Sequence, residues 1–191
     1  MPEDYRGLEL TTDNVAAAAA FDHVTEGYLS LSMDTGERLQ RVFEADANMP
    51  MAHVLKGYFF MLMGAGALKN KASDIANKMV GPLQDASTRE QLHGHALMAW
   101  ADGRLMEALA TWDQLLLDYP RDILALRLAH HGYFYKGDSQ NVRDVVARNL
   151  HGWDENVPGY GFVMGMRAFG LEETHAYETA IEAGSMALDI N

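Results

Sequence analysis

The segment Arg89 to Pro120, REQLHGHALMAWADGRLMEALATWDQLLLDYP, decides the fold of this chain. It predicts two amphipathic helices that are joined at Asp102, Gly103 and Arg104, and Pro120 ends the unit. In the second helix the apolar residues follow steps of three and four, which places them on one face: Leu105, Ala108, Leu109, Trp112, Leu115 and Leu116. One helix pair cannot bury such a face by itself, so the segment predicts stacking against similar units.

The same pattern recurs along the chain. Its turn position falls at Ser30, Gly64, Gly103, Gly137 and His175, with spacings of 34, 39, 34 and 38 residues. Gly103 at the turn, Ala108 at a small-residue contact, Trp112 at a large apolar position and Pro120 at the exit are similar to the tetratricopeptide pattern. We therefore expect an all-α fold, a tetratricopeptide-like right-handed superhelix of about five antiparallel helix pairs.

The repeat frame gives approximate bounds for each helix. The first helices of the pairs are expected at residues 13–31, 50–64, 88–102, 122–136 and 158–170. The second helices are expected at 34–46, 72–84, 104–118, 139–150 and 173–189. Residues 66–73 and 153–161 are rich in Gly, Asn, Lys or Pro and are expected to be loop insertions. Ser87 with Glu90, and Asp34 with Glu37, have the spacing of helix-capping boxes.

Residues 1–12 are expected to form an N-terminal extension, and residues 13–191 the repeat domain. The last segment, Tyr177 to Asn191, is typical of a second repeat helix that stops just before the expected proline. It would leave Ile181, Met186, Leu188 and Ile190 partly uncovered. We therefore expect the repeats to continue beyond the chain end, and a homodimer through this helix is the alternative.

Composition limits the classes of function. The chain has 191 residues, 48% of them hydrophobic and 22% charged, which is typical of an ordered globular protein. Its net charge of -12 argues against binding to nucleic acid or to anionic membranes, because both need clusters of Lys and Arg. It has no cysteine, its N-terminus lacks the pattern of a signal peptide, and its longest apolar stretch, Gly57 to Leu68, is too short to span a membrane. We expect a cytoplasmic protein.

The repeat frame also predicts a binding groove on the first helices. Three positions in each of the last four first helices would line it, which selects Val54, Tyr58, Met61, His93, Leu97, Trp100, Arg127, His131, Phe134, Gly165, Phe169 and Glu172. Aromatic side chains beside a few polar groups are suited to binding a protein segment or a small molecule. The candidate binding residues are Tyr58, His93, Trp100, Arg127, His130, His131, Phe134, Tyr135 and Phe169. For Trp100 and Phe134, packing inside the core is an equal alternative.

The sequence contains no nucleophile elbow, P-loop, dinucleotide-binding glycine pattern or zinc-protease motif, and it predicts no catalytic residue and no cofactor. Neighbouring histidines in the chain do not converge on one helix face. A metal site would need His93 to face His131 across the groove, and ordinary surface or hydrogen-bonded histidines are the favoured interpretation. Glu172 and Glu173 are expected at a helix start, where carboxylates favour the helix dipole.

Several segments closely resemble the tetratricopeptide-repeat protein 38 family. They are REQLH (Arg89 to His93), LALRLAHHGYFYKGD (Leu124 to Asp138), VRDVVAR (Val142 to Arg148), FGLEET (Phe169 to Thr174) and AIEAGSMALDIN (Ala180 to Asn191). The resemblance implies the helical-repeat fold, family-like positions at His93, His130 and Tyr133 to Tyr135, and a longer parent protein. The family's molecular function is largely uncharacterised, so the resemblance implies no reaction or ligand. This chain has His95 and His131 where the family often has a small or acidic residue, which weakens a metal site that needs either.

The leading functional hypothesis is a non-enzymatic scaffold that binds a protein segment through a concave aromatic groove. The alternative is an enzyme, or a protein that binds a small molecule or metal. In that alternative, missing C-terminal repeats complete a histidine-containing pocket, with His93 or His130 as ligand or general base.

Overall fold

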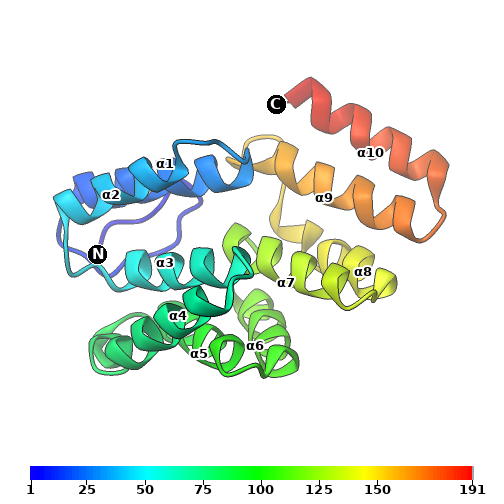
Figure 1. Cartoon of the computed structure of the whole chain (residues 1–191). Helices are drawn as coiled ribbons and strands as arrows, with labels where there is room; N and C mark the ends of the chain where they lie inside the picture. The colour runs from blue at the N-terminus through cyan, green and yellow to red at the C-terminus, as the bar shows by residue number, and fades with distance from the viewer. Residues whose placement is uncertain (191) are drawn as a thin grey trace. The chain divides into compact units, whose positions relative to one another are not determined.

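The computed structural model describes residues 1–190, and these residues form an all-α fold (Figure 1). They contain ten α-helices and two short 3-10 helices, and their only β-type pairing is an isolated bridge between Glu3 and Glu9. The fold class expected from the sequence is therefore confirmed. The chain divides into two compact units, Met1–Thr111 and Trp112–Asn191, which are described separately below. No helix within residues 1–190 is both long and apolar enough to cross a membrane.

The first unit contains five complete helices. They are α1 (Val15–Leu29), α2 (Thr35–Ala45), α3 (Pro50–Leu62), α4 (Gly66–Met79) and α5 (Thr88–Ala101), with the 3-10 helix Pro82–Asp85 before α5. Helix α1 packs on α2, α3 packs on α4, and α5 contacts both α3 and α4. Consecutive helices thus pack on each other in two pairs, α1 with α2 and α3 with α4. Helix α6 (Leu105–Asp118) runs across the boundary between the two units.

The second unit contains two complete helix pairs. Helix α7 (Ile123–Tyr135) packs on α8 (Ser139–Asn149), and α9 (Tyr160–Glu173) packs on α10 (Tyr177–Ile190) (Figure 1). Helix α8 also packs on α9, and the 3-10 helix Leu150–Gly152 follows α8. The expected loop after Trp153 is confirmed, and the Trp153 indole Nε1–H anchors it by donating to the Pro120 carbonyl over 2.8 Å.

A residue with positive φ follows the first helix of every pair. These residues are Leu31, Gly64, Gly103, Gly137 and His175. Four of the five turn positions are those expected from the sequence, and the first lies at Leu31, one residue after Ser30. At Gly137 the N–H of this residue donates to the Phe134 carbonyl (2.9 Å), and the next N–H, of Asp138, donates to the Tyr133 carbonyl (3.0 Å). The same two-bond pattern recurs at Leu31, Gly103 and His175, as in the Schellman motif.

Three local expectations are wrong. Residues 66–73 are not a loop, because α4 begins at Gly66 with the good helix formers Ala67, Leu68 and Lys69; the extra residues of this repeat instead follow α4. Helix α10 begins at Tyr177 rather than at residue 173. Asp34 does not form a capping box, because its carboxylate accepts hydrogen bonds from Ser32 and Arg38 instead of from the helix backbone. The capping box of Ser87 and Glu90 is confirmed.

The N-terminal extension is held against α1 and α5. The Tyr5 N–H donates to the buried Asp22 carboxylate of α1 over 3.1 Å. The Arg89 guanidinium of α5 donates to the Glu9 carbonyl over 2.8 Å, and the Thr11 N–H donates to Glu90 over 3.1 Å. Residues 1–12 are therefore packed as part of the first unit.

Helices α8 and α9 approach each other most closely at Gly170. A Cβ atom on Gly170 would lie 2.6 Å from the Arg143 Cα and 2.9 Å from the Arg143 backbone nitrogen. Both distances are shorter than a van der Waals contact, and backbone cannot turn aside as a side chain does. Gly165, one turn earlier in α9, has no such neighbour within 4 Å. The position of α9 on α8 therefore requires glycine at residue 170 but not at residue 165.

We expect Gly170→Ala to lower the free energy of unfolding by about 1 to 3 kcal/mol, because α9 must move away from α8. Gly165→Ala is the matched control in the same helix. It is expected to leave stability unchanged or to raise it by up to about 1 kcal/mol, through the higher helix propensity of alanine. Urea unfolding of both variants, followed by tryptophan fluorescence, measures the difference. Equal stabilities of the two variants would contradict the close approach.

Candidate functional site

Three aromatic side chains of the second unit lie together on its surface. Phe134 and Tyr135 belong to the last turn of α7, and Phe169 belongs to α9. Their exposed fractions are 42%, 69% and 38%. The Phe134 ring centroid lies 5.3 Å from that of Phe169 and 5.9 Å from that of Tyr135. We call these three residues the aromatic surface. Its members are among the candidate binding residues from the sequence, and the core alternative for Phe134 is wrong.

Tyr133, the neighbour of these residues in the chain, points in a different direction. Its ring is buried, and its hydroxyl donates to the Asp113 carboxylate over 2.6 Å. Burial and this hydrogen bond raise the pKa of the Tyr133 phenol. Asp113 also accepts a hydrogen bond from Arg148 of α8 over 3.1 Å. Tyr133 thus fixes α7 from the inside, while the next two residues are left exposed to solvent.

His130 lies beneath the aromatic surface. Its ring is buried, with its centroid 5.7 Å from that of Phe169, and its Nε2–H donates to the Met166 carbonyl of α9 over 3.2 Å. Because a carbonyl only accepts, the hydrogen of the neutral ring is on Nε2, and Nδ1 is an unprotonated acceptor. Burial, together with the positive charge of Arg127, lowers the pKa of His130 to about 4. His130 is therefore neutral near pH 7.

Arg127 lies next to both His130 and His131 on α7, because residues three and four apart on a helix are neighbours. Arg127 and His131 are half-buried. Arg127 Nε, His130 Nδ1 and His131 Nδ1 are shielded from solvent and have no hydrogen-bond partner among residues 1–190. Burial, and then the charge of Arg127, lower the pKa of His131 to about 4 as well. We call these three residues the polar cluster; a ligand can reach the three nitrogen atoms only if neighbouring side chains move.

The polar cluster is poorly suited to a metal ion. The positive charge of Arg127 lies close to both histidines and would repel a cation. Across residues 1–190 the structure gathers no group of three His, Asp or Glu side chains that could hold a metal. The expectation that His93 faces His131 concerns residues of different units, and it stays a prediction.

The three candidate residues of the first unit are less accessible. Tyr58 and His93 are fully buried, and the Tyr58 hydroxyl donates to the His93 carbonyl over 2.7 Å while also lying 3.1 Å from His93 Nδ1. Trp100 is half-buried, with its ring centroid 6.3 Å from that of Tyr58. The expectation that Tyr58 and His93 line an open surface is therefore not met, because Tyr58 of α3 and His93 of α5 are buried where these two helices pack together.

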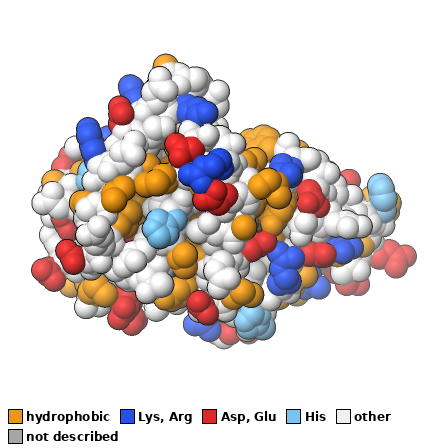
Figure 2. Space-filling view, turned by 90° about the horizontal axis from the view of Figure 1, so that it is seen from below, with side chains coloured by type: hydrophobic (Ala, Val, Ile, Leu, Met, Phe, Trp, Pro, Cys, Tyr) orange, Lys and Arg blue, Asp and Glu red, His pale blue; other side chains and the backbone are white. Residues whose placement is uncertain are grey.

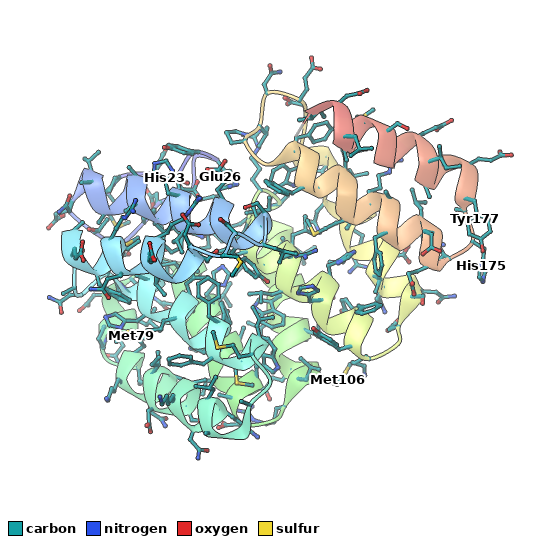
Figure 3. All side chains as sticks on the ribbon, turned by 45° about the horizontal axis from the view of Figure 1, so that its top comes forward. His23, Glu26, Met79, Met106, His175 and Tyr177 are labelled. Atoms are coloured by element: carbon teal, nitrogen blue, oxygen red, sulfur yellow. The ribbon has the colours of Figure 1, made fainter. Side chains whose placement is uncertain are left out.

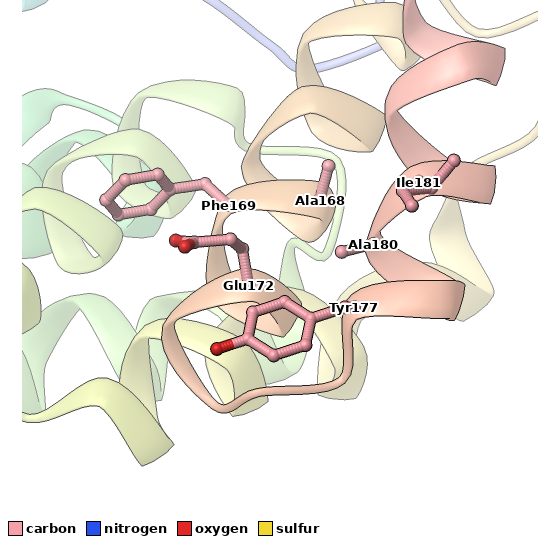
Figure 4. A pocket seen from close by; sticks show the side chains of 6 residues that line it. All are labelled: Ala168, Phe169, Glu172, Tyr177, Ala180 and Ile181. Carbon is pink, nitrogen blue, oxygen red and sulfur yellow. The ribbon is translucent and has the colours of Figure 1, made fainter.

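A shallow depression of about 450 Å³ lies between α9 and α10. It is lined by Ala168, Phe169, Glu172, Tyr177, Ala180 and Ile181 (Figure 4). Sequence reasoning placed Phe169 and Glu172 at groove positions but missed Tyr177. The turn predicted at His175 could have identified Tyr177. A residue two positions after the turn begins the second helix of the pair, so it lies beside the end of the first helix.

The expectation that Glu172 and Glu173 lie at a helix start is wrong. They are the last two residues of α9, where the carbonyl groups make the helix end partly negative. Glu173 accepts a hydrogen bond from Ser139 over 3.3 Å. Glu172 is exposed, and its carboxylate has no hydrogen bond or ion pair within residues 1–190.

Charges of both signs are mixed on the face drawn in Figure 2. Acidic and basic side chains alternate there with small hydrophobic areas, and that face shows no extended field of Lys and Arg. The surface drawn is consistent with the net charge of -12, which disfavours polyanionic ligands.

The low pKa of His130 predicts a specific dependence of stability on pH. An unfolded histidine takes up a proton near pH 6.5, whereas His130 in the folded chain does so only near pH 4. The unfolded state therefore binds more protons in this window, and acidification favours unfolding. From about pH 7 to about pH 5 we expect wild type to lose about 2 kcal/mol more of its unfolding free energy than His130→Gln.

Urea unfolding of both proteins across this pH range tests the prediction. The comparison with the variant is needed because burial raises the pKa of Asp22 to about 6, which changes stability in the opposite direction in both proteins. The NMR signal of the His130 ring in wild type gives a second readout, and it should not titrate above about pH 5. Identical pH slopes, or a ring that titrates near neutrality, would contradict a buried neutral His130.

The amino-acid sequence was also compared with models of known protein families, and no family model matches the chain. The aromatic surface, polar cluster and depression of the second unit are therefore the features that bear on function.

Proposed function

We propose that this chain is a helical-repeat scaffold that binds a segment of another protein through the aromatic surface. The observation that carries the proposal is the exposure of Phe134, Tyr135 and Phe169 in one adjoining group. Rings of this size contribute much of the energy of protein interfaces, because they bury a large apolar area and lose little rotational freedom. Three adjoining exposed rings are costly to leave in water, and a bound partner would cover them.

The polar cluster beside the aromatic surface supports the same function. A peptide backbone alternates carbonyl acceptors with N–H donors. Arg127 carries N–H donors and is only half-buried, so a carbonyl group of a bound segment offers an acceptor to its exposed part. Apolar anchors surrounded by a few directional polar groups are what a peptide-binding surface needs.

We extend the proposal to the arrangement of the repeats and to the family. The left-handed residue after each first helix and the recurring Schellman bonds support a tetratricopeptide-like right-handed superhelix, whose concave side would include the aromatic surface. The segments from Arg89 onward support membership of the tetratricopeptide-repeat protein 38 family. The acidic composition and the absence of cysteine fit a cytoplasmic scaffold without affinity for nucleic acid or membranes. A homodimer through α10 is the alternative partner, since Ile181 and Leu188 of that helix are exposed.

The second candidate is a small-molecule pocket or enzyme built on the histidines. The specific observation in its favour is the set of three shielded, unpartnered nitrogen atoms of Arg127, His130 and His131. Buried polar groups without a partner are uncommon in folded proteins, and a ligand is one explanation of them. A small polar ligand would then be lost in His131→Gln and retained in Phe134→Ala, the reverse of what the scaffold predicts.

A peptide selection tests the scaffold function. Peptides selected from a random-sequence library on the immobilised full chain are resynthesised, and their affinities are measured by calorimetry. We expect Phe134→Ala to weaken binding by about tenfold to thirtyfold, because truncation of a central aromatic anchor commonly costs about 2 kcal/mol. Leu188→Ala, which removes an exposed apolar side chain from α10, is the matched control and should bind like wild type.

The selection has two outcomes that contradict the scaffold. Failure to enrich any peptide over an immobilised control protein is one. The other is a set of peptides whose affinity is unchanged in Phe134→Ala and lowered in Leu188→Ala, which would place the binding surface on α10 instead.

A further inference from the structure

A carboxylate that the fold does not use lies at the edge of the depression between α9 and α10. Glu172 lies between the Phe169 and Tyr177 rings, and all three side chains border the same depression (Figure 4). Its carboxylate forms no hydrogen bond or ion pair within residues 1–190. The adjacent Glu173 differs, because it accepts a hydrogen bond from Ser139 of α8. Of the two acidic residues at this helix end, Glu172 is thus the one without a structural partner.

The position of Glu172 also disfavours the helix to which it belongs. The last turn of α9 carries the partial negative charge of its free carbonyl groups, and a second negative charge there is repelled. A neutral or basic residue would be better for stability at this position. A residue that lowers the stability of its helix and borders a depression is a candidate for a binding role.

The two aromatic walls of the depression are held in place by neighbours. The Tyr177 hydroxyl is hydrogen-bonded to His175 Nδ1 over 2.8 Å, and His175 is the left-handed residue of the turn (Figure 3). Phe169 packs edge-on against Phe134 and also contacts the His130 ring. The rings are therefore positioned before any ligand arrives, which lowers the entropy cost of binding.

These features fit one kind of ligand group. The negative carboxylate attracts a cation, and the faces of aromatic rings attract the same charge. Ala168, Ala180 and Ile181 supply the apolar part of the lining, which suits an aliphatic stem. A metal ion is a poor candidate, because a single carboxylate provides too few oxygen ligands. Lysine and arginine side chains have the required combination of a long apolar stem and a terminal positive charge.

We propose that the depression binds a Lys or Arg side chain, with the cationic group at the Glu172 carboxylate and beside the Phe169 and Tyr177 rings. This inference rests on the proposed function, because it names the side chain that the bound protein segment inserts. Phe169 belongs to both the aromatic surface and the depression, so one segment contacts the two together. The net charge of -12 favours the approach of a basic segment from solution.

Single amino acids test the chemistry of the depression directly. Nα-acetyl-lysine methylamide and Nα-acetyl-arginine methylamide are titrated into the isotope-labelled full chain, and the backbone amide signals are followed by NMR. Nα-acetyl-norleucine methylamide has a similar stem without the charge and is the matched ligand control. We expect both basic compounds to shift the signals of residues around Phe169, Glu172 and Tyr177, and the norleucine compound to bind about tenfold more weakly.

Two charge variants distinguish specific binding at Glu172 from general electrostatic attraction between a cation and the acidic chain. Glu172→Gln keeps the shape of the side chain and removes its charge, and it should weaken binding of the basic compounds by about threefold to fivefold. Glu155→Gln removes one exposed negative charge from the loop before α9 and is the matched control. It should change affinity by less than about twofold, because an exposed distant charge is screened by salt. Equal effects of the two variants, equal binding of norleucine, or no shift of these signals would overturn the proposal.

The two proposals fail in different ways. Selected peptides that depend on Phe134 but bind equally well after each Lys or Arg is replaced by norleucine or citrulline would overturn the basic-side-chain site and leave the scaffold intact. If the basic compounds bind at Glu172 but no selected peptide depends on Phe134, the basic-side-chain site is supported and the scaffold proposal is overturned. Both proposals are supported if replacing Lys or Arg in the Phe134-dependent peptides lowers their affinity for the wild-type chain but not for Glu172→Gln.

Discussion

Each helix pair depends on one residue that is held in the left-handed region of the backbone. At Gly64, Gly103 and Gly137 this conformation carries no steric cost, because glycine has no Cβ. At Leu31 and His175 it costs about 1 kcal/mol or more, which the surrounding contacts must offset. The Schellman bonds at Leu31, Gly103, Gly137 and His175 satisfy carbonyl groups of the preceding helix, and the chain reverses there within a few residues. The two apolar faces of a pair can meet only because this reversal is so short.

In the second unit the surface features depend on a further constraint, the close approach at Gly170. With no Cβ at this position, α9 lies directly against the Arg143 backbone of α8. That contact sets where α9 presents its side chains. Phe169, the residue before Gly170, is thereby brought against Phe134 of α7, and Glu172 is placed at the edge of α10. The aromatic surface and the depression are thus consequences of how tightly two helices pack.

The sequence predicts the helices and their turns well for a physical reason. Apolar spacing and glycine position are local properties, and here they agree with the tertiary contacts, as at Gly103 and Gly137. Exposure is harder to predict, because a first helix packed on several neighbours is apolar on most of its sides. Tyr58 and Phe134 are both predicted groove residues of first helices, yet one is fully buried and the other is partly exposed. Tyr58 is buried where α5 packs on α3.

Glu172 shows how a small error in a boundary changes a functional interpretation. Placing the end of α9 a few residues too early puts this carboxylate at a helix start, where it would stabilise the helix. In the structure α9 continues to Glu173, so the same carboxylate lies at the unfavourable end, next to two aromatic rings. The sign of its interaction with the helix is reversed, and stability no longer accounts for its presence. A bound cation would restore the balance, because it neutralises the carboxylate and is itself favoured at a helix C-terminus. A bound cation would therefore supply the positive charge that the C-terminal end of α9 favours and that Glu172 lacks.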